Sequence, residues 1–259
     1  MTLDDYILNP MGKKNAVLNA SARESIRKMY KFKFDNILLR ENGKINYHLF
    51  TRQEDNTYWA YIKVPSETVK GFYYDVVFKF YADNDVKEAG KNLFKYNVKF
   101  FSNDPAFVYT YAYVFAHHNL FIEELVRKMS KKALTTSAEE KNPNEVIGYV
   151  KIIYFAYLVM ENRKLNKVSK FESEAKPFDL PYLYSEIENT DDKIEERQEE
   201  GKHVSQRKKL TVDKKTGDRI KRLSKGKDTS RLQISTSKRV KKIKSANKNS
   251  KFVKTTKKK

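Results

Sequence analysis

Three charged residues in the middle of the chain are of the types that a metal-dependent nuclease uses. Asp75 precedes the triplet Asp85-Val86-Lys87, which loosely fits an acidic residue followed by D-x-K. In such a site two carboxylates hold Mg²⁺ and the lysine stabilises developing negative charge. The pattern is permissive in a chain with 33% charged residues, and Asp191-Asp192-Lys193 repeats it. We therefore expect a chance match, with Asp83-Asn84-Asp85 at a hairpin tip.

A second candidate for metal chemistry surrounds His117-His118. On a continuous helix His117, Phe121 and Glu124 would share one face, so that an imidazole and a carboxylate could meet there. Adjacent histidines point in different directions, however, and the segment offers no third ligand. We expect instead a partly exposed corner between two helices near Asn119, and we predict no cofactor.

Aromatic side chains gather in two places where nucleic-acid bases could stack. The first string is Phe107, Tyr109, Tyr111, Tyr113 and Phe115. Its period of two would suit a strand that forms a stacking platform, but the preceding Asp104-Pro105 favours a helix start, which makes the string mostly core. The second group is Tyr58, Trp59, Tyr61, Phe72, Tyr73 and Tyr74. It lies in predicted strands, where exposed tyrosines could form an interface.

The usual sequence signatures of enzymes are missing from the chain. There is no G-x-x-x-x-G-K-[ST] phosphate loop, no Rossmann glycine pattern and no G-x-S-x-G turn. The absence of cysteine excludes disulfides, cysteine-ligated metals and thiol catalysis. The first residues lack the pattern of a signal peptide, and no run approaches about 18 apolar residues. We expect a noncatalytic protein that is neither secreted by a signal peptide nor inserted in a membrane.

The elements that would position these residues change in type along the chain. Ser21 and Glu24 have the spacing of a capping box, which predicts a short helix to about Tyr30. Five strands follow, and Asn42-Gly43 between the first two is a strong hairpin signal. The predicted strands cover residues 36–39, 45–49, 57–64, 72–81 and 93–101.

Helices are predicted after the strands. They cover residues 105–116, 120–133 and 142–163, and Asn142-Pro143 repeats the pattern of a capping residue followed by proline. A run of strands followed by a run of helices indicates an α+β fold. We expect an antiparallel sheet of about five strands with packed helices, and a disordered basic segment after it.

Charge and aromatic content divide the chain into four parts. Residues 1–17 are predicted to be an arm, 18–170 the α+β core, and 171–200 an acidic connector of net charge −8 with a helix over residues 183–198. Residues 201–259, here named the basic tail, hold 23 Lys/Arg and three Asp, and so carry the entire net charge of +20. They contain one of the 34 aromatic residues, Phe252. Such a segment cannot offset the entropy of ordering its backbone.

The basic tail has the composition of a polyanion-binding segment. Flexible lysine-rich chains bind phosphates by displacing condensed counterions, without reading sequence. An acidic protein, an anionic lipid surface or a role in solubility is the alternative, but the tail has no organised apolar face for a membrane. The residues predicted to bind nucleic acid are Arg207, Lys208, Lys209, Lys214, Lys215, Arg219, Lys221, Arg222, Lys238, Arg239, Lys241, Lys242, Lys244, Lys257, Lys258 and Lys259.

Two short segments give the chain a resemblance to a known group. They are Asn9-Pro10-Met11-Gly12-Lys13-Lys14-Asn15-Ala16-Val17 and Ser102-Asn103-Asp104-Pro105-Ala106-Phe107-Val108-Tyr109-Thr110-Tyr111. Both resemble uncharacterised proteins encoded by tailed bacteriophages of low-GC bacteria, over residues 1 to about 200. The resemblance implies a component of the virion or a protein associated with its genome, found in the particle or the host cytoplasm.

Three functions follow as hypotheses. The first is a noncatalytic phage assembly protein whose folded part docks to protein subunits and whose tail binds nucleic acid, DNA more readily than RNA. The second is a nonspecific DNA- or RNA-binding accessory factor of replication or transcription. The third is a nuclease that uses Asp75, Asp85 and Lys87. The acidic connector could also fold back on the tail and weaken its binding, since opposite charges attract within about 8–10 Å.

Overall fold

The computed structural model describes residues 1–9, 19–52, 54–82, 92–125, 133–135, 142–173 and 180–201. These residues form an α+β fold, as the sequence predicts. The chain divides into two units, Met1–Glu195 and Glu196–Lys259. In the second unit the structure describes only residues 196–201, which are helical.

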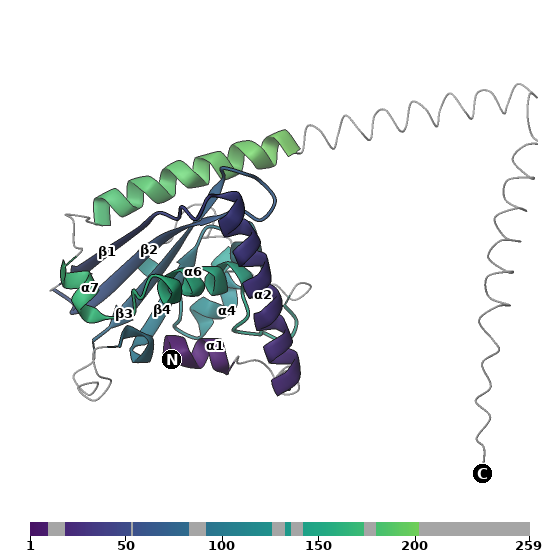
Figure 1. Ribbon diagram of the computed structural model, residues 1–259. Coiled ribbons are helices and arrows are strands. Elements are labelled where there is room, and N and C mark those ends of the chain that lie inside the picture. The colour runs from purple at the N-terminus through teal and green to yellow at the C-terminus, as the bar shows by residue number, and fades with distance from the viewer. Residues whose placement is uncertain are drawn as a thin grey trace, which may run out of the picture. The chain divides into compact units, whose positions relative to one another are not determined.

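Four antiparallel strands form the sheet in the order β1-β2-β3-β4. They are β1 (Tyr47–Arg52), β2 (Thr57–Pro65), β3 (Tyr73–Tyr81) and β4 (Asn97–Ser102), and each pairs with the next along the chain (Figure 1). Directly opposite residues include Trp59 and Lys79, which therefore lie on the same face. The strands predicted at residues 57–64 and 72–81 are confirmed.

The prediction of five strands is wrong because its first strand belongs to a helix. Residues 36–39 lie within α2 (Ala20–Arg40), which is also longer than the predicted short helix. The Asn42-Gly43 pair does not turn a hairpin but ends α2. Both residues have positive φ, and the Gly43 N–H donates to the Leu38 carbonyl at 2.7 Å. Asparagine and glycine suit this helix-ending conformation as well as they suit a hairpin turn.

One face of the sheet is covered by apolar helices. α6 (Lys151–Asn162) is apolar almost all round and buries eight of its residues, because it lies between the sheet and α2. Phe155 of α6 contacts Phe34 of α2, with ring centroids 5.6 Å apart. α1 (Leu3–Leu8), which falls in the predicted N-terminal arm, buries Leu3, Tyr6 and Ile7 in the same core. α7 (Val168–Ser173) reaches Tyr58 through Phe171.

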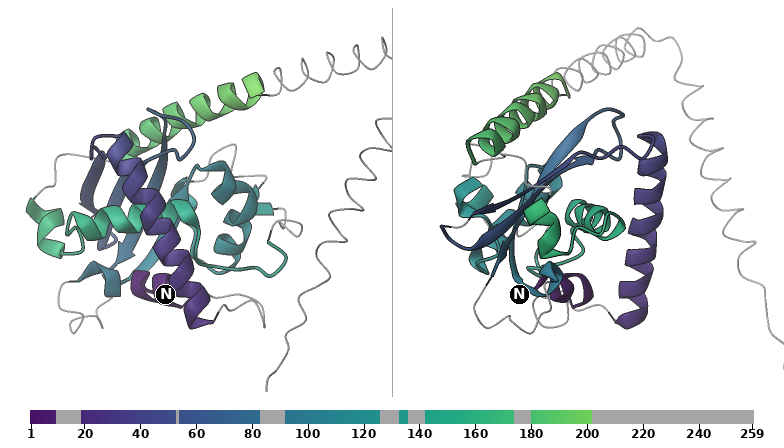
Figure 2. Two further views of the ribbon diagram at one scale, coloured as in Figure 1. Left: turned by 45° about the vertical axis from the view of Figure 1, so that its right-hand side comes forward. Right: turned by 60° about the vertical axis from the view of Figure 1, so that its left-hand side comes forward.

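The opposite face of the sheet is covered by the helix that begins at residue 180. Figure 2 shows the sheet between this helix and the pair α2 and α6. Leu183, Ile187, Thr190 and Ile194 are buried at spacings of 4, 3 and 4, which gives one inward stripe. The helix predicted over residues 183–198 is therefore confirmed. Residues 180–195 belong to the compact unit that contains the sheet, although they fall in the predicted connector.

The outer edge of β4, which pairs with no further strand of the sheet, is hydrogen-bonded to two short segments. The Val98 N–H donates to the Met1 carbonyl at 3.0 Å. The Phe100 N–H donates to the Leu120 carbonyl at 2.7 Å, and the Phe100 carbonyl accepts from the Ile122 N–H at 3.0 Å. The helix predicted from residue 120 is thus wrong over residues 120–122, which pair with β4 instead. A 3₁₀ turn, η3 (Glu123–Leu125), follows.

The remaining helix predictions are confirmed in part. The helix predicted over residues 105–116 exists as α3 (Pro105–Thr110) and α4 (Ala112–His117), broken at Tyr111. The helix predicted from residue 142 begins only at Lys151. The Asn142 side chain caps a turn by accepting from the Val146 N–H at 2.9 Å, and Tyr149 has a φ of 55°. Residues 93–95 form a 3₁₀ turn, η2 (Leu93–Lys95), so β4 is shorter than predicted.

Candidate functional site

Asp75, the one nuclease candidate that the structure describes, lies fully buried on β3. Its carboxylate accepts hydrogen bonds from Tyr61 Oη at 2.7 Å and from Asn103 Nδ2 at 2.9 Å. Asn103 also accepts from the Asp75 backbone N–H at 2.8 Å. Burial raises the pKa of Asp75, although these hydrogen bonds oppose the shift. The same burial, together with the nearby Asp75, raises the pKa of Tyr61.

This environment makes Asp75 a structural residue. Both carboxylate oxygens already accept hydrogen bonds, and a buried carboxylate without access to water is a poor ligand for a hydrated Mg²⁺ ion. Asp85 and Lys87 lie outside the described residues. Within the described ranges no cluster of three or more His, Asp or Glu residues is arranged to hold a metal ion.

The histidine pair lies at an exposed corner, as the sequence predicts, but this corner joins α4 to the segment that pairs with β4 and not to a second helix. His117 ends α4 and is exposed, and its ring stacks on Tyr113 with centroids 5.6 Å apart. The chain then turns at Asn119, where φ is 55°. Glu124 points elsewhere, because it accepts a hydrogen bond from Lys79 at 2.5 Å. The structure therefore does not bring His117 and Glu124 together.

Lys79 is a buried cation that no sequence motif indicates. It lies on β3 with its ammonium 3.1 Å from Asp55 and 2.5 Å from Glu124. The same ammonium lies 4.8 Å from the ring centroid of Trp59 and 5.2 Å from that of Tyr81. A lysine inside the apolar strand Phe78-Lys79-Phe80 could have indicated this position. Its charge is balanced by carboxylates and ring faces, which is the arrangement of a stabilising ion cluster.

The aromatic groups pack mainly as core. In the first string Phe107 and Phe115 are buried, with ring centroids 5.2 Å apart, while Tyr109 is exposed. In the sheet group Trp59, Tyr61 and Phe72 are buried. Tyr58, Tyr73 and Tyr74 are half-buried. The first string is therefore core at Phe107 and Phe115, as the sequence predicts, and these two rings contact each other and do not form a stacking platform.

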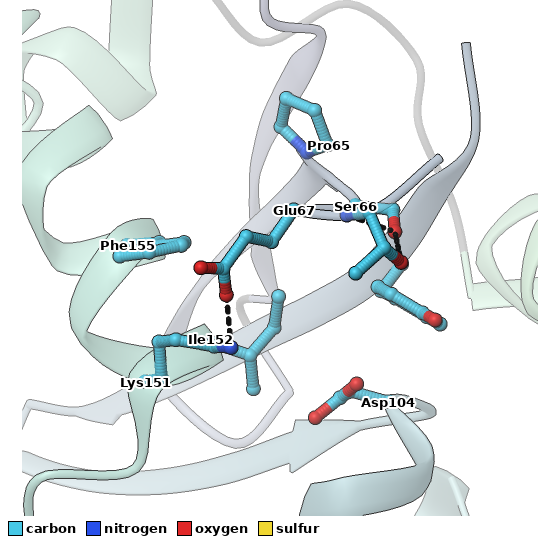
Figure 3. A pocket seen from close by; sticks show the side chains of 9 residues that line it. Pro65, Ser66, Glu67, Asp104, Lys151, Ile152 and Phe155 are labelled. Carbon is cyan, nitrogen blue, oxygen red and sulfur yellow. Dashed lines mark hydrogen bonds and ion pairs between the residues drawn. The ribbon is translucent and has the colours of Figure 1, made fainter. Parts of the chain in front are cut away.

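A small hollow lies between the end of β2 and the start of α6. It has a volume of about 130 Å³. Figure 3 shows the side chains of Glu67, Lys151 and Asp104 around it. Glu67 accepts from Lys151 and pairs with Lys33 at 2.9 Å, and these two lysines lower the pKa of Glu67. Burial raises the pKa of Asp104, which caps α3 by accepting from the Phe107 N–H.

A wider hollow lies beside the β4 edge. Its volume is about 460 Å³, and Lys99, His118 and Asn97 are among its lining residues. Ammonium, imidazole and amide groups are donors that suit the oxygens of an anion such as phosphate. The hollow is wide and open, so it can accept a surface group and does not enclose a small molecule.

The predicted nucleic-acid-binding residues, Arg207 to Lys259, lie outside the described residues. The lysines of the folded unit that the structure does describe are often paired with carboxylates. Lys63 contacts Glu186 at 2.5 Å, and Lys151 and Lys33 share Glu67. These pairs reduce the positive charge that the folded unit presents to a polyanion.

The structure fixes part of the acidic segment. Glu186 is engaged with Lys63 of β2, and Leu183 and Ile187 are buried against the sheet. Glu188, Asp192 and Glu195 are exposed on the outer side of this helix. A charge interaction between these carboxylates and the basic tail stays a prediction.

The sequence and the structure were compared with protein-family models, with curated proteins and with solved structures, and none of these matches the chain.

None of the helices that the structure describes is long and apolar enough to cross a membrane.

Proposed function

We propose that this chain is a noncatalytic assembly protein that binds nucleic acid through its basic tail and docks to protein subunits through its folded unit. The single observation that carries the proposal is the separation of charge. Residues 201–259 carry a net charge of +20, whereas residues 1–200 are neutral overall. Counterion release from a polyanion is the largest favourable term available to such a segment.

The contacts within the folded unit support separate roles for this unit and the tail. Its buried carboxylate Asp75 is satisfied by Tyr61 and Asn103, so the best nuclease candidate serves the fold. Its lysines pair with glutamates across the surface, as Lys63 does with Glu186. Because residues 1–200 are neutral overall, the tail is the expected contact for phosphates.

The resemblance to proteins of tailed bacteriophages supports a place in a particle. In that setting the folded unit would contact other subunits and the tail would contact the packaged genome. Duplex DNA is the expected partner because such particles package it. Purification of particles, followed by detection of this chain in them, separates an assembly role from a role in replication or transcription.

Binding of the full chain to a random-sequence DNA duplex, measured by fluorescence anisotropy across a salt series, tests the proposal. If about eight tail cations engage phosphates, the logarithm of the affinity should fall with the logarithm of salt at a slope of roughly −7. A chain whose tail Lys and Arg are replaced by Gln should lose most of this affinity and most of the slope.

The matched control keeps the composition of the tail but shuffles its order. Counterion release depends on the number of positive charges in the tail and not on the order of its residues. The shuffled chain should therefore bind as tightly as the natural one. Undiminished binding by the neutralised chain would contradict the proposal, and so would weak binding by the shuffled chain.

A further inference from the structure

α2 presents large apolar side chains to solvent on the side away from the fold. Its inner side carries the buried Phe34 and Ile37. On its outer side Met29, Phe32 and Leu39 are 46%, 68% and 77% exposed. Figure 2 shows α2 at the rim of the folded unit, with α6 on its inner side only. A soluble helix normally places charged residues on such an outer face.

The outer residues of α2 follow the spacing of a coiled-coil seam. They are the half-buried Ala22 and the exposed Ser25, Met29, Phe32, Asn36 and Leu39, separated by 3, 4, 3, 4 and 3 residues. Apolar residues at this alternation form one stripe along a helix, and two such stripes pack by inserting side chains between one another. The stripe also contains two polar residues, Ser25 and Asn36, and a polar residue at such a position often specifies the alignment of the two helices.

The stripe is complementary to itself when a second copy runs in the opposite direction. If the pair is centred between Tyr30 and Lys31, Met29 faces Phe32 of the second copy. Ser25 then faces Asn36, and Ala22 faces Leu39. Each contact thus joins two large side chains, two polar side chains, or a small side chain with a large one. The Ser25 hydroxyl donates to the Ser21 carbonyl at 2.9 Å, which leaves its oxygen able to accept from the Asn36 amide.

The charges beside the stripe favour the same arrangement. Lys28 and Asp35 flank it, and in the antiparallel pair Lys28 of one copy faces Asp35 of the other. Both are exposed, and each contacts one residue of its own helix, Lys28 with Glu24 at 2.7 Å and Asp35 with Lys31 at 3.2 Å. A parallel pair would instead bring Lys28 beside Lys33 of the second copy, which is repulsive. It would also bring Asp35 beside Arg40, but Arg40 is already paired with Glu41 at 2.9 Å.

We propose that α2 is a dimer interface, in which two copies of this chain pair as antiparallel helices through Met29, Phe32 and Leu39. This surface is distinct from the tail, and the proposal does not rest on the proposed function, because the contact needs no nucleic acid. The occupant is a second copy because the stripe matches itself in size, polarity and flanking charge.

The mass of the full chain, measured by sedimentation equilibrium over a concentration series after nuclease treatment, tests the interface. The natural chain should approach twice the chain mass. Phe32→Glu should weaken the dimer at least tenfold, since it places a charge at the centre of the buried stripe. Tyr182→Glu is the control, because Tyr182 is a similarly exposed aromatic outside α2, and it should leave the dissociation constant unchanged.

An unaltered far-UV circular dichroism spectrum shows that the Phe32→Glu chain is folded, and Leu39→Glu is the second variant with the same expected result. A natural chain that stays monomeric at every concentration would overturn the proposal. So would a dimer that Phe32→Glu and Leu39→Glu leave intact.

Disulfide trapping tests the antiparallel direction, because the chain contains no cysteine of its own. A mixture of Ser25→Cys and Asn36→Cys chains should cross-link on mild oxidation, whereas each chain alone should not. Cross-linking of Ser25→Cys with itself would show a parallel pair and overturn this arrangement. Absence of cross-links in the mixture, with a dimer present, would overturn the register.

Discussion

The two faces of the sheet are buried by different means. On the face covered by α6 the contacts are apolar, and Phe155 packs with Phe34 and Tyr30. On the face covered by the helix that begins at residue 180, polar and charged side chains are buried as well, among them Asp75 and Lys79. The difference teaches that the first face stabilises the fold by excluding water. The second face adds buried hydrogen bonds and ion pairs, which stabilise the fold only if every buried polar group has a partner.

Removal of a ring from the apolar face should have the largest effect. Phe155→Ala should lower the free energy of unfolding by about 3–5 kcal/mol, because it deletes buried surface and leaves a cavity. Chemical denaturation followed by circular dichroism measures the loss. Phe155→Leu, which retains most of the volume, should lose clearly less. An equal loss for both variants would mean that cavity formation does not dominate on this face.

The polar face should respond to the loss of a hydrogen-bond acceptor. Asp75→Ala leaves Tyr61 Oη and Asn103 Nδ2 buried without their acceptor, and should cost about 2–3 kcal/mol. Asp75→Asn should cost less, since its amide oxygen can still accept one of the two bonds. Denaturation at neutral pH compares the two. A harmless Asp75→Ala would show that this network does not stabilise the face.

Asp75 should also make the free energy of unfolding depend on pH. Burial raises the folded pKa of Asp75 above its ordinary value of 3.8. The natural chain should therefore lose stability as pH rises from about 3.8 through that folded pKa, because the unfolded state releases its proton first. Asp75→Asn should lack this decline.

The ion cluster at Lys79 should give the smallest effect, with the opposite pH dependence. Burial works to raise the pKa of Glu124, but the hydrogen bond and charge of Lys79 outweigh it and lower that pKa below 4.5. Stability from this pair is present above pH 4.5 and is lost as pH falls through the folded pKa. Glu124→Gln should cost about 0.5–1 kcal/mol at neutral pH, since Glu124 is partly exposed and Asp55 still pairs with Lys79. Urea denaturation at pH 7 and at pH 3 checks this, and an equal loss at both would contradict it.

The sequence predicted the fold class and the two central strands because their signals are local. Residues 57–64 and 72–81 are rich in aromatic and β-branched residues and have no competing helical pattern. The Asn42-Gly43 pair was misleading because residues with positive φ both end helices and turn hairpins. The packing of Phe34 of α2 against Phe155 of α6 decides between the two, and it joins distant parts of the chain. Likewise, the sequence before Lys151 has the pattern of a capped helix start. In the structure the Asn142 side chain instead accepts from the Val146 N–H and closes a local turn.

The site residues were harder to predict than the fold. Asp75 was found as a candidate carboxylate, but its role depends on Tyr61, Asn103 and the helix over residues 180–195, which come from distant parts of the chain. Lys79 was missed because no motif describes a lysine buried among rings. The outward stripe of α2 was hidden for a different reason: residues 36–39 had been predicted to be a strand, which divides the heptad spacing.

The occupied edge of β4 bears on how this protein behaves at high concentration. An aromatic-rich sheet with a bare edge can add strands from neighbouring molecules and grow into fibrous aggregates. Here the outward amides of Val98 and Phe100 are already bonded to Met1 and Leu120. A molecule that meets this edge finds these backbone donors satisfied, so crowding of many copies should not lead to strand addition at these positions.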